Sequence, residues 1–309
     1  MIFKVRLMRL MKLMKQGSMI VLAAGLASMP AIADEEVNRT IDADDDGYIE
    51  IYNTSGTIKI TGWDRDSVEI KGVLGDSVEE LIVERDGNEI LIRVEVPNRH
   101  WGDSDADLDI RVPKGSSIEV SGVSTDIEVE GVLGEQSLGT VSGDIETSGV
   151  ADDVEAESVS GDVDIQGNGA EGSFDAETVS GDVTVRGMSG SVSVGSVSGD
   201  VEVIGGSYEE AYFESVNGDQ TFQAELTQDG DLSMESVNGS VDIEFTVPIT
   251  SARFDIETFN GSIRNCFGPQ PERTSKYSPG LELSFTIGDG DARIDIETLN
   301  GSVNVCNAD

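Results

Sequence analysis

The residues best suited to chemistry in this 309-residue chain are aspartates that recur every 18 to 20 residues. Each follows the glycine of a Val-Ser-Gly or Val-Asn-Gly sequence, and the set comprises Asp144, Asp162, Asp182, Asp200 and Asp219. If the repeats stack as coils, successive carboxylates lie ~4.8 Å apart and repel by ~0.9 kcal/mol per pair even at the dielectric of water. Backbone N–H groups and solvent screening are the simpler ways to offset this repulsion. Weak binding of Ca²⁺ along the row is the alternative, and no other cofactor is expected.

Groups that could carry catalysis are sparse elsewhere. The chain has one histidine, His100, beside Trp101, and two cysteines. A nucleophile elbow of the form G-x-S-x-G does not occur in the sequence. The composition therefore predicts a protein that is not an enzyme. Because carboxylates are abundant, a carbohydrate-active enzyme of the polysaccharide lyase or hydrolase type is the alternative.

The elements that must position the aspartates form a repeat of about 20 residues, which indicates a stack of identical supersecondary units. Apolar and polar residues alternate on both sides of each Ser-Gly or Asn-Gly corner, as in Ala292–Thr298 and Ser302–Cys306. Asn-Gly corners also suit a row of antiparallel hairpins. Like residues recur at equivalent positions, which favours coils lying side by side. The prediction is an all-β fold: a single-stranded parallel β-solenoid with an N-terminal strand-rich cap.

The two cysteines stand at equivalent places in the repeat. Cys266 and Cys306 each follow the glycine of an Asn-Gly-Ser corner, Gly261 or Gly301, by five residues. Equivalent positions in neighbouring coils lie within the Cα separation that a disulfide needs. We expect a Cys266–Cys306 disulfide, with two free thiols as the alternative.

Composition divides the chain into three segments. Residues 1–33 combine a basic start, a short apolar run and a small-residue site, which predicts a signal peptide cleaved after Ala33. Residues 34–115 are expected to form the cap and the first coils, and residues 116–309 the repeat solenoid. A Pro-containing insertion at residues 267–280 either caps the last coil or carries a binding surface.

Charge narrows the range of partners. The net charge is −40, with 60 Asp and Glu against 20 Lys and Arg. Such a surface repels phosphate backbones and anionic lipid headgroups, so we expect neither nucleic-acid binding nor direct membrane insertion after cleavage of the signal peptide.

Several motifs resemble a known family. They are the signal peptide, Gly62-Trp63-Asp64, the segment Arg111–Gly115 and the recurring Val-Ser-Gly-Asp-Val. Together they resemble the bacterial "putative adhesin" family of exported β-strand-repeat proteins, catalogued as a domain of unknown function. The resemblance covers nearly all of the chain after the leader. It implies a β-helix-like domain in the cell envelope, and it supplies no catalytic residues.

These observations favour a non-enzymatic, exported cell-envelope protein. Its acidic scaffold is expected to serve adhesion, or the binding of envelope or extracellular polymers or proteins. An envelope-stress or assembly accessory protein is a further alternative. Periplasmic residence is preferred over the cell surface, because no surface-anchoring motif is visible.

Overall fold

A computed structural model describes residues 35–97, 104–169, 171–275 and 278–308. The predicted signal peptide and the His100–Trp101 pair lie outside these residues. Within the described ranges, no helix is long and apolar enough to cross a membrane.

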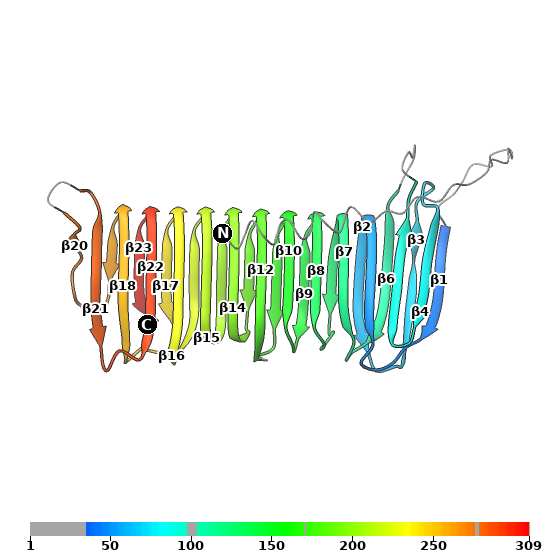
Figure 1. The fold of residues 1–309 in the computed structure, drawn as a ribbon, viewed down its shortest axis with the longest axis horizontal. Coiled ribbons are helices and arrows are strands. Elements are labelled where there is room, and N and C mark those ends of the chain that lie inside the picture. The colour runs from blue at the N-terminus through cyan, green and yellow to red at the C-terminus, as the bar shows by residue number, and fades with distance from the viewer. Residues whose placement is uncertain (1–34, 98–103, 170, 276–277, 309) are drawn as a thin grey trace. The chain divides into compact units, whose positions relative to one another are not determined.

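The described chain is all-β, and its strands follow one another in a long row (Figure 1). The first six strands are β1 (Glu35–Asp42), β2 (Tyr48–Trp63), β3 (Ser67–Leu74), β4 (Glu80–Asp86), β5 (Glu89–Glu95) and β6 (Ala106–Pro113). The next nine are β7 (Ser117–Glu130), β8 (Gln136–Ser142), β9 (Ile145–Val150), β10 (Val154–Ser160), β11 (Val163–Gly167), β12 (Glu171–Ser180), β13 (Val183–Arg186), β14 (Ser189–Ser198) and β15 (Val201–Asn217). The last eight are β16 (Gln220–Asn238), β17 (Val241–Phe245), β18 (Ala252–Asn260), β19 (Ile263–Asn265), β20 (Glu272–Arg273), β21 (Leu281–Ile287), β22 (Ala292–Asn300) and β23 (Val303–Asn307).

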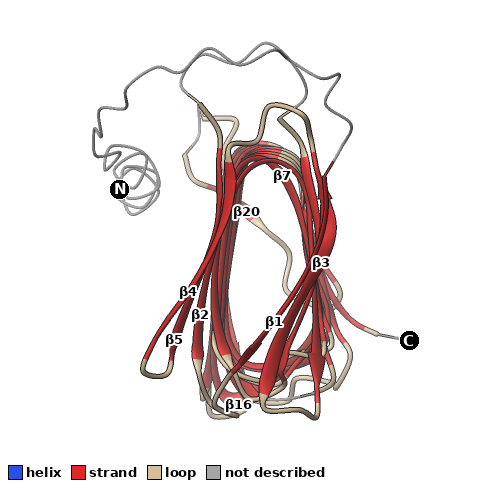
Figure 2. Cartoon of the chain, turned by 90° about the vertical axis from the view of Figure 1, so that its right-hand side faces the viewer, coloured by secondary structure: helices blue, strands red, loops and turns tan. Residues whose placement is uncertain are grey.

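Hydrogen bonding joins these strands into two ladders that face each other across the core (Figure 2). Ladder 1 runs in the order β4-β5-β2-β7-β8-β10-β12-β14-β15-β16-β22-β18-β21-β20. Ladder 2 runs in the order β1-β3-β6-β2-β7-β9-β11-β13-β15-β16-β17-β23-β19. The long strands β2, β7, β15 and β16 belong to both ladders. One end of each strand pairs in ladder 1 and the other end pairs in ladder 2.

Strand direction is mixed. Pairing is parallel from β2 through the repeats, as the stacking of like residues predicts. It is antiparallel toward both ends, where β1 pairs with β3, β3 with β6, β4 with β5, and β21 with both β18 and β20. The all-β prediction is therefore correct, whereas a uniformly parallel stack is not what the ends show.

Alternation of side chains produces the core. In β22, Ala292, Ile294 and Ile296 are buried while Arg293 and Glu297 are exposed. Because register is kept between coils, each buried residue meets its equivalents, and Ile296 lies opposite both Met234 and Ile256. The core is thus made of apolar rows that run along the stack, the arrangement expected for residues of period two.

The corner glycines allow the coils to approach closely. A Cβ at Gly199 would lie only 1.9 Å from the backbone oxygen of Gly181 in the preceding coil. Gly218 and Gly239 have the same 1.9 Å approach to the corners before them. A side chain cannot fit at such a corner, and this explains why glycine recurs there.

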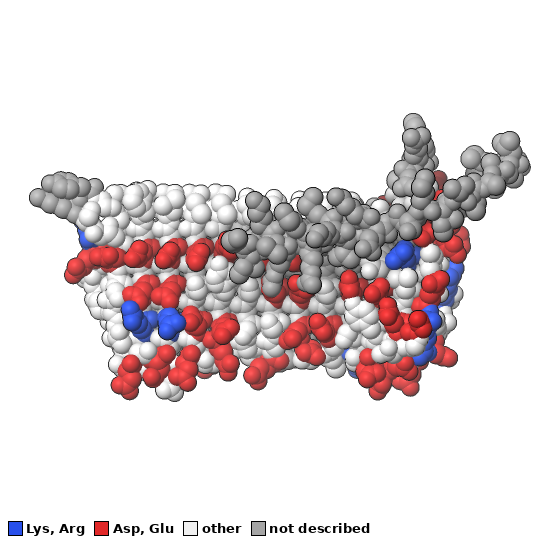
Figure 3. Space-filling view, in the orientation of Figure 1, with Lys and Arg blue, Asp and Glu red and all other residues white. Residues whose placement is uncertain are grey.

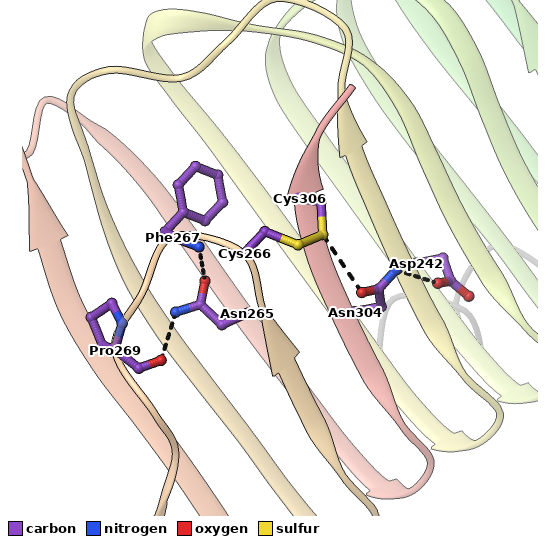
Figure 4. The surroundings of a disulfide bond; sticks show 7 residues. All are labelled: Asp242, Asn265, Cys266, Phe267, Pro269, Asn304 and Cys306. Atoms are coloured by element: carbon purple, nitrogen blue, oxygen red, sulfur yellow. Dashed lines mark hydrogen bonds between the residues drawn. A yellow bond between two sulfur atoms is a disulfide. The ribbon is translucent and has the colours of Figure 1, made fainter. Parts of the chain in front are cut away.

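The C-terminal coil does not follow chain order. Strand β22 lies between β16 and β18 in ladder 1, and β23 lies between β17 and β19 in ladder 2. The expectation that successive coils lie side by side is therefore wrong at this end, because the last coil fills a place between two earlier ones. Its strand β23 is tied to the residue after β19 by the Cys266–Cys306 disulfide, with a Cα–Cα separation of 5.0 Å (Figure 4).

Aromatic side chains close the end of the core. Phe254 stacks on Phe285 with ring centroids 4.5 Å apart, and Phe267 lies 5.2 Å from Phe254. Phe267 opens the Pro-containing insertion, and the insertion itself adds the short strand β20 outside β21. This part of the insertion therefore covers the coil of β18 at the end of the stack, which is the capping role considered from its composition.

Candidate functional site

The five predicted aspartates form a single row at the corners. The backbone N–H of Asp162 donates to Asp144 Oδ1 at 2.9 Å, and that of Asp182 donates to Asp162 Oδ1 at 2.8 Å. Asp200 and Asp219 continue the pattern, each donating at 2.8 Å to the aspartate before it. Each of the first four carboxylates thus accepts a hydrogen bond from the next coil. Backbone N–H groups, one of the three offsets considered from the sequence, stabilise this row.

The row is longer by one carboxylate than the sequence motif indicates. Asp126 Oδ1 accepts from the backbone N–H of Asp144 at 3.1 Å, although the residues directly before Asp126 are Ser124-Thr125 rather than Ser-Gly. At the other end, Asp219 Oδ1 accepts from the N–H of Ser240 at 2.7 Å. The row therefore links seven successive corners and acts as a structural seam between coils.

Cation binding at this seam stays a prediction. Within the part of the chain that the structure describes, no three His, Cys, Asp or Glu side chains gather closely enough to hold a metal ion. If pairs of neighbouring aspartates bind Ca²⁺ weakly, adding Ca²⁺ to chelator-treated protein at low salt should raise the melting temperature. An unchanged melting temperature would contradict the prediction.

A second row of carboxylates lies on ladder 1 in the C-terminal repeats. Strand register places Glu214 beside Glu235, Glu235 beside Glu297, and Glu297 beside Glu257. Glu282 of β21 continues the row beyond Glu257. We call these five residues the glutamate row, and Figure 3 shows it as a line of acidic side chains at the left, below a band of uncharged ones.

The carboxylates of the glutamate row make few hydrogen bonds to the rest of the described chain. Tyr212 Oη donates to Glu214 Oε2 at 3.4 Å. Within the described residues, the carboxylates of Glu235, Glu257 and Glu297 have no hydrogen-bond or ion-pair partner, although the Glu235 backbone oxygen accepts a hydrogen bond from Gln220 Nε2 at 2.8 Å. Their carboxylates therefore face solvent at the spacing of the strands, with only water and salt to screen them.

An apolar row runs parallel to the glutamates, two residues further along each strand. Val237, Leu299 and Phe259 are 39%, 48% and 50% exposed, and Val216 beside them is half-buried. In the same register position, Val159 and Val179 of the earlier repeats are also half-buried. Val123, at the same position of β7, is 41% exposed, so the C-terminal repeats differ in bringing three exposed apolar side chains next to one another.

A groove of about 330 Å³ lies between the two rows. Buried hydroxyl side chains lie between its walls, from Ser215, Ser236, Thr258 and Thr298. Thr274 and Gly280 of the insertion also line the groove. The insertion therefore caps the core through Phe267 and also borders a concave surface through Thr274, while its role in binding stays a prediction.

Tyr212 lies next to the groove and stays protonated at physiological pH. Its burial raises the pKa of the phenol to about 12, and the nearby Glu214 and Glu235 carboxylates add to the shift. A neutral hydroxyl that donates to Glu214 is a fixed part of the wall rather than a titrating group.

The groove-lining residues belong to a recurring sequence motif that was not identified from the sequence alone. Four repeats contain Glu, then Ser or Thr, then an apolar residue, then Asn-Gly, beginning at Glu214, Glu235, Glu257 and Glu297. The Asn-Gly corners were recognised, but the glutamate four residues before each glycine was not. Its recurrence, together with the change from Val to Phe259 and Leu299, was the available signal.

These features define a class of protein: a strand-repeat chain of two facing ladders, with glycine corners and a groove along one set of corners. The chain belongs to the Toastrack DUF4097 family, whose sequence model matches residues 47–306. The family resemblance drawn from the motifs is thereby confirmed.

Several solved structures are similar to the chain. A protein described as a putative adhesin from Parabacteroides distasonis is 10% identical, with 88% of this chain and 97% of that chain covered and a TM-score of 0.45. One with the same description from Bacteroides fragilis is 13% identical over 88% and 97%, with a TM-score of 0.38. A putative lipid binding protein from Parabacteroides distasonis is 11% identical over 88% and 96%, with a TM-score of 0.34. No curated protein matches the sequence significantly.

Proposed function

We propose that the chain is an exported, non-enzymatic cell-envelope protein that binds an envelope or extracellular polymer or protein along the groove. The observation that carries this proposal is the groove itself, with one wall of glutamates and one of exposed apolar side chains. A concave surface with charged and apolar sides orients a ligand as well as holding it.

The scaffold suits binding at a rigid surface. We further propose that the repeats from β7 to β17 wind continuously as a β-solenoid, in which each coil contacts only its neighbours and equivalent side chains form long rows. The aspartate seam joins the first two groove-forming coils and the disulfide joins the last two, so little conformational freedom is lost when a ligand binds.

Catalysis in the same groove is the less favoured interpretation. Hydrolysis by paired carboxylates needs two groups in different environments, one acting as an acid and the other as a base or nucleophile. The groove instead presents Glu214, Glu235, Glu257 and Glu297 at equivalent positions of successive coils. Equivalent glutamates suit repeated contacts with an extended ligand better than acid–base catalysis.

Binding is tested by sedimenting the purified mature chain with isolated cell envelopes. We expect the wild-type protein to co-sediment and the Phe259→Ser/Leu299→Ser variant to lose most of this binding. Leu133→Ser/Val247→Ser is the matched control, because Leu133 and Val247 are similarly exposed, at 42% and 49%, but lie outside the groove. Absence of wild-type binding, or equal loss in both variants, would contradict the proposal.

Export and compartment are tested separately, by protease treatment of intact and lysed cells that carry a C-terminally tagged copy. Digestion in intact cells would support surface display and adhesion. Protection until lysis would support periplasmic residence and a role in envelope maintenance or assembly.

A further inference from the structure

We infer that the occupant of the groove is a basic amphipathic α-helix of a protein partner. This inference rests on the proposed function and deepens it by naming the class of ligand. Four properties of the groove support it: the charge of one wall, the exposure of the other, the spacing of the coils and the size of the groove.

The negative charge of the glutamate wall favours a positively charged ligand. Glu235, Glu297 and Glu257 are consecutive in ladder 1, and their carboxylates have no hydrogen-bond or ion-pair partner within the described residues. Like charges in register on neighbouring strands repel, so positively charged side chains placed between them gain twice: by attraction and by relief of the repulsion. A row of lysines or arginines is the complementary partner.

The opposite wall calls for apolar groups beside those cations. Val237, Leu299 and Phe259 expose 39% to 50% of their surfaces, and each lies two residues from a glutamate of the same strand. A ligand that covers both walls must therefore carry a basic stripe next to an apolar stripe. A polymer charged on all sides would leave the apolar wall exposed to water.

The spacing of the coils favours a helix over an extended peptide. The four groove-forming strands β15, β16, β22 and β18 are consecutive in the ladder, so their equivalent residues span about 14 Å. Three helical turns rise about 16 Å, which places one side chain of each stripe opposite each coil. Side chains on one face of an extended peptide recur every ~6.8 Å and would span ~20 Å over the same number of contacts.

The size of the groove agrees with a helix lying across the strands. A volume of about 330 Å³ accepts side chains from one face of a helix rather than a whole chain. Recognition of this kind, in which the apolar face of an amphipathic helix lies in a groove, uses anchors at positions i, i+3 or i+4, and i+7. Thr274 of the insertion borders the same surface.

Binding of synthetic peptides to the mature chain tests this inference. The probe is an 18-residue helical peptide of Lys, Leu and Ala with adjacent lysine and leucine stripes, whose helicity is checked by circular dichroism. The control peptide has the same composition but alternates Lys and Leu, so that its stripes form only in an extended chain. Calorimetric titration at low and physiological salt gives the two dissociation constants.

Matched protein variants locate the site. We expect Glu235→Gln/Glu297→Gln to weaken helical-peptide binding by about fivefold, since each exposed ion pair contributes modestly. Glu146→Gln/Glu202→Gln removes the same charge from ladder 2 and should leave the affinity unchanged. Phe259→Ser/Leu299→Ser should weaken helical-peptide binding more than Glu235→Gln/Glu297→Gln does. In this variant the affinity should also depend less on the leucines of the peptide.

Each outcome decides the inference. Preferential binding of the helical peptide that the groove variants weaken and the control variant does not would support it. Equal affinity for both peptides, or equal loss in the control variant, would show attraction to an acidic surface in general and overturn it. Groove-dependent envelope binding that survives protease treatment of the envelopes would point to a polysaccharide: it overturns the helix and leaves the proposed function standing. If wild-type protein binds neither envelopes nor peptide, both fail.

Discussion

The aspartate seam and the glutamate row are built on the same coils with the same spacing, yet their surroundings differ. Along the seam, the carboxylate of one coil accepts the backbone N–H of the next, at 2.8 Å for Asp182 and Asp200. Along the glutamate row, Glu235, Glu257 and Glu297 have no such donor among the described residues. The seam lies at the turn, where an N–H points along the stack, whereas the glutamates lie within strands whose N–H groups already serve the ladder.

This difference separates two uses of repeated charge. A carboxylate row that is supplied with backbone donors holds coils together and has little left to offer a ligand. A row without donors costs the fold some repulsion and remains available to a cationic partner. Repetition alone therefore does not identify a binding site, and the hydrogen-bond partners of each member must be examined.

The largest expected effect comes from removing the disulfide, which joins two coils that carry the glutamate row and none that carry the aspartate seam. Cys266→Ser/Cys306→Ser should lower the free energy of unfolding of the C-terminal coils by up to ~4 kcal/mol, because the bridge joins residues 40 apart in sequence. Hydrogen exchange should show faster opening of β22 and β23, with little change at the corners from Asp144 to Asp182. Uniform change along the chain, or full labelling of the unreduced denatured wild type by a thiol reagent, would contradict this.

Pairing of the cysteines was predictable because each stands five residues after a corner glycine, so any register that aligns the corners also aligns them. The strand segments and the aspartate row were predictable for the same reason. Period-two alternation and the Gly-Asp corners are local signals that need no knowledge of the whole fold.

The order of the last coils and the groove were not predictable in this way. Asn300 lies opposite both Asn238 and Asn260, and each of these corners presents the same backbone and nearly the same apolar neighbours. Local sequence therefore does not distinguish stacking β22 outside β18 from placing it between β16 and β18. The antiparallel pairing of β21 with β18, a long-range contact, accompanies the observed order. The glutamate row becomes contiguous only once this order is known.

The next largest effect tests whether close approach at the corners maintains the seam. Gly199→Ala should destabilise the protein by about 3 kcal/mol, because its Cβ would lie 1.9 Å from the Gly181 oxygen and force the coils apart. Gly87→Ala is the control: Gly87 also has positive φ, at 66°, but a Cβ there meets nothing within 4 Å. It should cost only ~1 kcal/mol. Urea denaturation compares the two, and similar costs would show that conformation rather than contact explains the corner glycines.

A smaller effect tests the seam's hydrogen bonds directly. Asp182→Ala removes the acceptor for the Asp200 N–H and should lower the free energy of unfolding by about 1 kcal/mol. The loss is reduced by the relief of repulsion between the Asp182 carboxylate and its two neighbours in the seam. Asp182→Asn keeps an acceptor oxygen and should remain close to wild type. Equal destabilisation by both substitutions would mean that the charge, rather than the hydrogen bond, stabilises the seam.

The smallest effect has the opposite sign and concerns the glutamate row. Glu297 lies between Glu235 and Glu257, so Glu297→Gln removes two repulsions without removing a known partner. Stability should rise by ~0.5 kcal/mol at low salt, below the unscreened Coulomb value because the side chains are exposed. In 1 M NaCl the gain should disappear, since the Debye length falls to ~3 Å. A fall in stability at low salt would mean that the carboxylate is already balanced within the chain, and the charge argument for a basic ligand in the groove would fail with it.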